Sequence, residues 1–127
     1  SMRAALQGNA HAQALSAHLY LEGIGVAKDL DQALRWGKLS AGQGNDAAQE
    51  LLAHMYFDGN GVKKDFRQAA HWAKLAAHQN NVNAQAFLAT LYLAGHGVKK
   101  DESMAKYWAK KAGNRGHKGA LEIVARL

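Results

Sequence analysis

The chain has 127 residues, enough for one domain, and its 48 % apolar and 20 % charged residues are typical of a globular protein. It contains no cysteine, which excludes disulfides and cysteine-based metal sites, and no proline that would interrupt helices. No apolar run approaches the roughly 20 residues that a membrane-spanning helix needs, so we expect no membrane insertion. The formal net charge of +6 mildly favours acidic partners.

A ten-residue stretch occurs three times at a spacing of 36 residues, which identifies an internal repeat. The three copies are YLEGIGVAKD from Tyr20, YFDGNGVKKD from Tyr56 and YLAGHGVKKD from Tyr92. We therefore expect one repeat domain over residues 3–127. Its predicted parts are three full units at 9–44, 45–80 and 81–116, with partial units at 3–8 and 117–127.

Each unit holds two apolar patterns of helical period, and we name the predicted helices the A helix and the B helix. In the second unit the A helix is expected near 46–58 and the B helix near 66–78, because apolar residues recur there at i, i+3, i+4 and i+7. Alternation with a period of two, which would indicate strands, is absent. The pattern predicts an all-α fold.

The turn between the two helices has a fixed chemistry. A glycine ends each A helix, where a left-handed residue is favoured, and a second glycine lets the chain reverse. The valine that follows is expected to fill the space between the two helices. An aspartate then caps the B helix, and a glutamine three residues later completes a capping box in two units. The positions are Gly23, Gly59 and Gly95; Val26, Val62 and Val98; Asp29, Asp65 and Asp101; Gln32 and Gln68.

Two other features of the repeat have a structural and a functional interpretation. The glycine pair could belong to a phosphate loop, but no Gly-Lys-Ser/Thr or third glycine follows. The tryptophan column could stack on nucleic-acid bases, but a helix whose other apolar residues are alanines needs it for the core. At the end of the B helix, glycine or asparagine again permits a left-handed residue. The tryptophan column consists of Trp36, Trp72 and Trp108. The residues at the B-helix ends are Gly8, Gly44, Asn80 and Gly116.

The columns resemble the Sel1-like repeat, a relative of the tetratricopeptide repeat. In the second unit they are Ala48, Leu52, Tyr56, Gly59, Gly61, Val62, Asp65, Ala69 and Trp72. The resemblance covers nearly the whole chain. Ser16 and Gly37 depart from the family pattern in the first unit, which we expect to be the least stable of the three. It implies antiparallel helix pairs stacked as a right-handed α-solenoid, with the A helices on the concave face. It also implies a scaffold role in protein–protein interaction, often in bacteria.

The partner-binding face is predicted on the side of the A helices that adjoins their core face. A row of apolar and hydrogen-bonding groups there suits an extended peptide or a partner helix. The apolar members could equally complete the core between repeats, and both interpretations stay open. The candidates are His11, His18, Leu21, Glu50, His54, Phe57, Asn83, Thr90 and Leu93.

We expect no metal, no cofactor and no enzymatic activity. His11 and His18 are seven residues apart, about 10 Å along a helix, which is too far for two ligands of one ion. The serines stand in no nucleophile motif, and the acidic residues show no paired arrangement for acid–base chemistry.

The predicted function is that of a non-catalytic adaptor that binds a protein or peptide along the A helices. The alternative is a basic surface that binds acidic proteins or nucleic acid, formed by Lys110, Lys111, Arg115 and Lys118. No nucleic-acid motif supports nucleic acid as a partner. Incomplete end units expose apolar faces, which suggests further repeats or self-association. No signal peptide is visible and Ser1-Met2 resembles an expression remnant, so the compartment, cytoplasm or periplasm, stays open.

Overall fold

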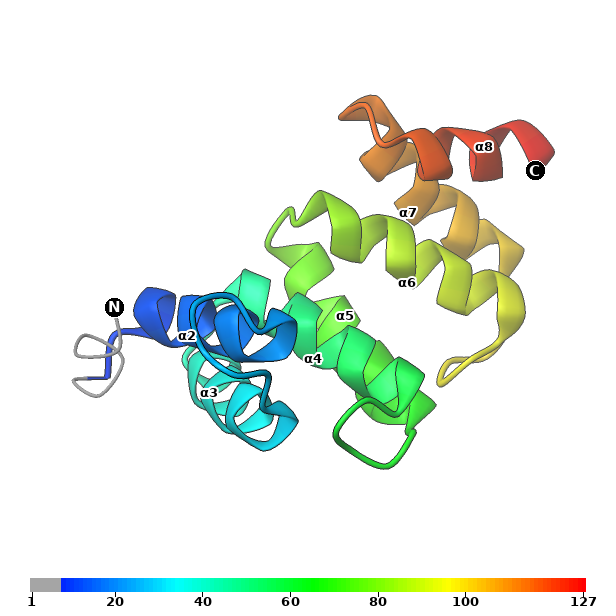
Figure 1. Cartoon of the computed structure of the whole chain (residues 1–127). Helices are drawn as coiled ribbons and strands as arrows, with labels where there is room; N and C mark the ends of the chain where they lie inside the picture. The colour runs from blue at the N-terminus through cyan, green and yellow to red at the C-terminus, as the bar shows by residue number, and fades with distance from the viewer. Residues whose placement is uncertain (1–7) are drawn as a thin grey trace.

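The computed structural model describes residues 8–127, and every regular element in that range is an α-helix (Figure 1). The all-α prediction is therefore confirmed, and the second unit has helices with the predicted bounds. The predicted partial unit at 3–8 lies, apart from Gly8, outside the described residues. The helices are α2 (Ala10–Glu22), α3 (Leu30–Gly42), α4 (Asp46–Asp58), α5 (Phe66–His78), α6 (Val82–Ala94), α7 (Glu102–Asn114) and α8 (Lys118–Arg126).

The helices form antiparallel pairs that stack one on the next as a solenoid. The A helices α2, α4 and α6 pair with the B helices α3, α5 and α7, and α8 packs on α7 as the A helix of a fourth, partial unit (Figure 1). Each B helix also contacts the following A helix, so the chain order is the stacking order. No helix between residues 8 and 127 combines the length and the apolarity needed to cross a membrane.

The turn inside each pair follows the predicted capping chemistry. Gly23, Gly59 and Gly95 end the A helices with φ of 69°, 69° and 72°. The aspartate carboxylates accept from the first backbone N–H groups of the B helices, as in the bond from the Gln68 N–H to Asp65 at 3.2 Å. Asn80, at φ 67°, adopts the left-handed conformation expected at the end of a B helix.

The capping box itself is only half formed. Its second bond would use the backbone N–H of the capping aspartate, but that group donates to a tyrosine carbonyl of the A helix instead. The Asp65 N–H lies 2.9 Å from the Tyr56 carbonyl, and the other two pairs have the same bond at 3.0 Å. The turn thus ties the start of each B helix directly to the end of its A helix, which leaves the glutamine no donor to satisfy.

The second glycine of each turn has a further role between pairs. A Cβ added at Gly61 would lie 2.9 Å from the Leu30 Cβ, and one at Gly97 would overlap the carbonyl of Phe66. Both contacts are with the start of the preceding B helix. Gly25, at the same turn position of the first pair, has no described atom within 4 Å of such a Cβ. Close approach of successive pairs therefore requires glycine at 61 and 97.

The valine prediction is correct in the second and third pairs and wrong in the first. Val62 and Val98 are half-buried and pack against the core. Val26 is 37 % exposed. The buried valines are covered where one pair stacks on the pair before it, and no described pair precedes the first one.

The core is built mainly from alanine, with a few large side chains between the helices. Trp36 and Trp108 are buried, which confirms the core interpretation of the tryptophan column, and Trp72 is half-buried. Gly37 is a core position as well. A Cβ there would approach methyl groups of Leu51 and Leu52 to 3.3 Å, so the missing side chain makes room for the next A helix.

Buried glutamines join successive pairs through hydrogen bonds that the sequence analysis did not anticipate. Gln49 on α4 donates to the Ala41 carbonyl of α3 at 3.3 Å, and Gln85 donates to the Ala77 carbonyl at 3.1 Å. These carbonyls, at the ends of B helices, also accept from the backbone N–H groups of Gly44 and Asn80 just beyond each helix. The signal was the recurrence of Gln13, Gln49 and Gln85 at 36 residues.

Candidate partner-binding groove

Two adjoining clefts run along the A helices, and we name them together the groove. The first has a volume of about 740 Å³ between α2 and α4. The second has about 460 Å³ and is bounded by α4, α6 and α8. Both clefts are lined by Glu50 and His54, so they meet on the exposed side of α4. The groove thus crosses all three pairs on the side of the A helices.

Most of the predicted partner-binding residues line the groove. His11, His18 and Leu21 line the first cleft, and Asn83 and Thr90 line the second. These residues come together because the period of 36 residues places equivalent A-helix positions side by side in the stack. Glu50 and His54 line both clefts, and the Glu50 Oε2 lies 3.9 Å from the His54 Nε2.

Phe57 and Leu93 line neither cleft. The Phe57 ring packs instead between pairs, with its centroid 5.1 Å from that of Phe66, 5.2 Å from Phe87 and 5.9 Å from His96. Leu93 is half-buried. For Phe57, the structure favours the interpretation that the column completes the core between repeats, whereas Leu21 both lines the groove and packs on the core.

Several groove residues were not among the candidates. Leu15, Leu51 and Phe87 share a column that the helical pattern assigns to the core. Their side chains reach the groove because each lies at the edge of the core face, as Phe87 shows by packing on His54 with ring centroids 4.5 Å apart. The others come from the turns, from α4 and from the last helix. These others are Lys28 and Asn60 in turns, Met55 on α4, and His117, Gly119 and Ile123 at α8.

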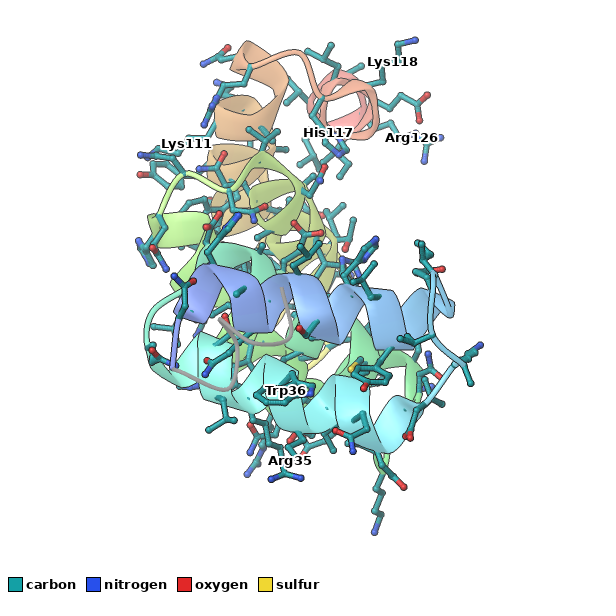
Figure 2. All side chains as sticks on the ribbon, turned by 60° about the vertical axis from the view of Figure 1, so that its left-hand side comes forward. Arg35, Trp36, Lys111, His117, Lys118 and Arg126 are labelled. Atoms are coloured by element: carbon teal, nitrogen blue, oxygen red, sulfur yellow. The ribbon has the colours of Figure 1, made fainter. Side chains whose placement is uncertain are left out.

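His117 contributes both to the groove and to helix capping. It precedes α8, where the other A helices have the asparagine caps Asn9, Asn45 and Asn81. Its Nδ1 accepts from the Ala120 N–H at 3.1 Å, so in the neutral ring the proton sits on Nε2. Figure 2 shows His117 at the start of α8. The His117 imidazole therefore both caps α8 and lines the second cleft.

The basic residues predicted as an alternative site lie outside the groove, and two of them have internal contacts. Lys110 and Lys111 are exposed on α7, and the Lys111 Nζ lies 5.4 Å from the Tyr107 ring centroid. Arg115 donates to the Asn80 carbonyl at 2.7 Å. Lys118 begins α8. Figure 2 shows Lys111 directed away from the stacked helices.

The groove offers carboxylates, imidazoles and apolar side chains, which suit binding by hydrogen bonds and hydrophobic contact. Across residues 8–127, no three His, Cys, Asp or Glu side chains are grouped so that they could hold a metal ion.

Comparison with known proteins places this geometry in a family. The family model described as Sel1 repeat matches residues 10–45, 46–81 and 82–117. A Sel1 repeat protein from Oxalobacter formigenes is 35 % identical with a TM-score of 0.88, over 97 % of this chain and 92 % of that one. The protective antigen c5321 of uropathogenic Escherichia coli, which displays an SLR fold, is 38 % identical with a TM-score of 0.91. That match covers 94 % of this chain and only 26 % of the antigen.

A more distant structure, cysteine-rich protein B of Helicobacter pylori, shares the fold at 24 % identity with a TM-score of 0.76, over 95 % of this chain and 92 % of that one. A search of curated proteins found no match. One family model matches three consecutive segments of the chain, and the helix pairs stack with the same period of 36 residues. Two solved bacterial proteins also resemble the chain at more than 30 % identity. The chain belongs to the Sel1 repeat family.

Proposed function

We propose that this chain is a non-catalytic scaffold that binds a peptide or protein segment in the groove. Sel1 repeat proteins generally mediate protein–protein interaction and are typically non-catalytic. The observation that carries the proposal is the continuity of the two clefts along three stacked pairs. One side of each A helix builds the core, and the side that adjoins it lines the groove.

The composition of the groove matches the recognition of a segment rather than of a small molecule. The exposed Leu15, at 46 % exposure, and half-buried apolar side chains such as Leu51 and Phe87 line it together with imidazole, amide and hydroxyl groups. Apolar anchors contribute most of the affinity in such grooves, and polar groups fix orientation. An extended or helical segment can contact several units at once, because equivalent residues recur at each pair.

Site-specific photo-crosslinking in source cells tests the proposal. Benzoylphenylalanine placed singly at His18, His54 or Thr90 should capture a partner protein. The matched controls are the exposed B-helix positions Lys38, Lys74 and Lys110, which are equivalent to one another in the three pairs. We expect adducts from the groove positions and none from the controls.

The outcomes separate the groove from the competing sites. Adducts from Lys110 alone, lost at high salt, would place the function on the basic surface instead. Adducts between two copies of this chain would indicate self-association. If none of the three groove positions gives an adduct, although circular dichroism shows that the variants are folded, the groove is not the binding site.

A further inference from the structure

We propose that the groove selects a cationic segment, in which lysine or arginine side chains accompany apolar ones. This inference rests on the proposed function, since it specifies the chemistry of the segment that the groove takes. It is opposite in sign to what the net charge of +6 suggests.

Within the three full pairs, the charged residues of the helices differ in predominant sign between the A and the B helices. The A helices α2, α4 and α6 contain no lysine or arginine, and they carry Glu22, Asp46, Glu50 and Asp58. The B helices carry the basic residues Arg35, Lys38, Arg67, Lys74, Lys106, Lys110 and Lys111. Figure 2 shows Arg35 and Lys111 directed away from the stack. The last A-type helix, α8, does carry Lys118 and Arg126, but neither residue lines the groove. The lysines and arginines of the helices therefore lie outside the groove.

Three carboxylates and a single cation line the first cleft. The carboxylates are Glu22, Glu50 and Asp58, and the cation is Lys28. In the part of the chain that the structure describes, the one carboxylate within 4 Å of a basic side-chain nitrogen is that of Glu50, beside the His54 imidazole, so Glu22 and Asp58 have no such partner. Distant B-helix charges act weakly here, because physiological salt screens exposed charges beyond about 8 Å. Acidic side chains thus outnumber basic ones by three to one in the lining of the first cleft.

Two of these carboxylates oppose the helix dipole. Glu22 and Asp58 are the last residues of α2 and α4, and no basic residue occupies the last turn of either helix. A carboxylate at a helix C-terminus is unfavourable, since that end already carries partial negative charge. The equivalent residue in the third pair is Ala94, which shows that the fold does not need an acid at this position. A cation bound at this end would relieve the repulsion.

The second cleft supplies the apolar half of the site. Its lining includes Ala86, Phe87 and Ile123, and its only carboxylate is the shared Glu50. A segment that lays a lysine or arginine in the first cleft can therefore place an apolar side chain in the second. Charge complementarity commits the proposal to a cationic segment of a partner over an acidic one, and the experiment below distinguishes this partner from a second copy of the chain.

Selection of phage-displayed random dodecapeptides on the immobilised protein tests the inference. We expect the enriched peptides to contain more Lys and Arg than Asp and Glu. Their affinity, measured by fluorescence anisotropy with synthetic peptides, should fall about tenfold in the E22Q/E50Q/D58N variant, since partly exposed charge pairs each contribute a few-fold. The control variant D31N/E102Q/E122Q changes net charge equally outside the groove and should change affinity less than twofold.

A neutral blocking variant distinguishes failure of this inference from failure of the proposed function. Thr90→Trp adds bulk at an exposed position of the second cleft. If the enriched peptides are acidic or uncharged and bind the wild type but not T90W, the charge inference is overturned and groove binding stands. No enriched peptide, or peptides insensitive to both groove variants, would contradict groove binding itself. Sedimentation showing a dimer that E22Q/E50Q/D58N abolishes would make a second copy the occupant and overturn the inference.

Discussion

Gln79 donates through its Nε2 to the Oε1 of Gln49 at 2.8 Å, and through the same amide to the carbonyl of Gly44 at 2.7 Å. The first pair has the equivalent bond from Gln43 to Gln13 at 2.6 Å. The third pair breaks the series, because Arg115 occupies the place of Gln79. Arg115 keeps the bond to the carbonyl, that of Asn80, but the buried Gln85 Oε1 is left without a donor among the described residues.

Arg115→Gln should therefore stabilise the protein. The new amide can donate to both Asn80 and Gln85, as Gln79 does one unit earlier, and a satisfied buried acceptor contributes about 0.5–1.5 kcal/mol. Urea denaturation followed by circular dichroism measures the gain. The reverse change, Gln79→Arg, should destabilise by about 1–3 kcal/mol because it leaves the buried Gln49 Oε1 without a donor. Equal or lower stability of R115Q would show that the series of glutamine bonds does not contribute as argued.

Gly97→Ala and Gly25→Ala form a matched pair, since both residues have φ of 74°. Alanine at either position bears the left-handed strain of about 1–2 kcal/mol. Only at Gly97 does the new methyl group also collide with the backbone at Phe66 and push two pairs apart. Thermal and urea denaturation should show a clearly larger loss for G97A. Similar losses of stability for both variants would mean that the close approach between pairs does not contribute to the free energy of unfolding.

Asp65→Ala should lower the free energy of unfolding by about 1 kcal/mol, because the N–H groups of Arg67 and Gln68 lose their capping carboxylate. Asp31→Ala is the control. Asp31 is an exposed first-turn residue of α3 that caps nothing, so its loss should stay within about 0.5 kcal/mol. Equilibrium denaturation of the two variants side by side would refute the cap assignment if their losses were the same.

Tyr92→Phe should change how stability depends on alkaline pH. Burial, and secondarily the nearby Asp101 carboxylate, raise the pKa of the Tyr92 phenol above its ordinary 10.0. The folded state then keeps a proton that the unfolded chain loses, so this contribution to stability is complete below pH 10 and is lost as pH rises through the folded pKa. Relative to Y92F, the wild type should lose stability above pH 10. A constant difference between the two proteins across that range would contradict the shift.

The local chemistry of the turns was predictable from the sequence because it depends on single residues. A left-handed backbone needs glycine or asparagine, and a B-helix start needs an acceptor, so Gly59, Asn80 and Asp65 identify their own positions. Much of the groove was predictable too. Helical periodicity places His18 beside the core face, and the period of 36 places His54 and Thr90 next to it.

The rest of the fold and of the groove depends on contacts between units, which the aligned sequences of the repeats do not show. Phe57 turns toward Phe66 and Phe87 because aromatic neighbours are present there, and Leu21 in the same column has none of them. Val26 has the same sequence context as Val62 but lacks a described preceding pair to cover it. Gln49 is a polar residue at a buried position, and its hydrogen bonds to the Ala41 carbonyl and from Gln79 explain it. In each case the deciding partner lies in another unit.

The division of each A helix into a core side and a groove side has a consequence for how such proteins diversify. Across the three units the core columns hardly vary, whereas the groove columns vary freely: His18 and His54 against Thr90, Glu22 and Asp58 against Ala94. A mutation on the groove side can change what the protein recognises without disturbing the stack. One duplicated unit thus becomes an independent site on which selection can act, and the ligand specificity of a solenoid can evolve one helix at a time.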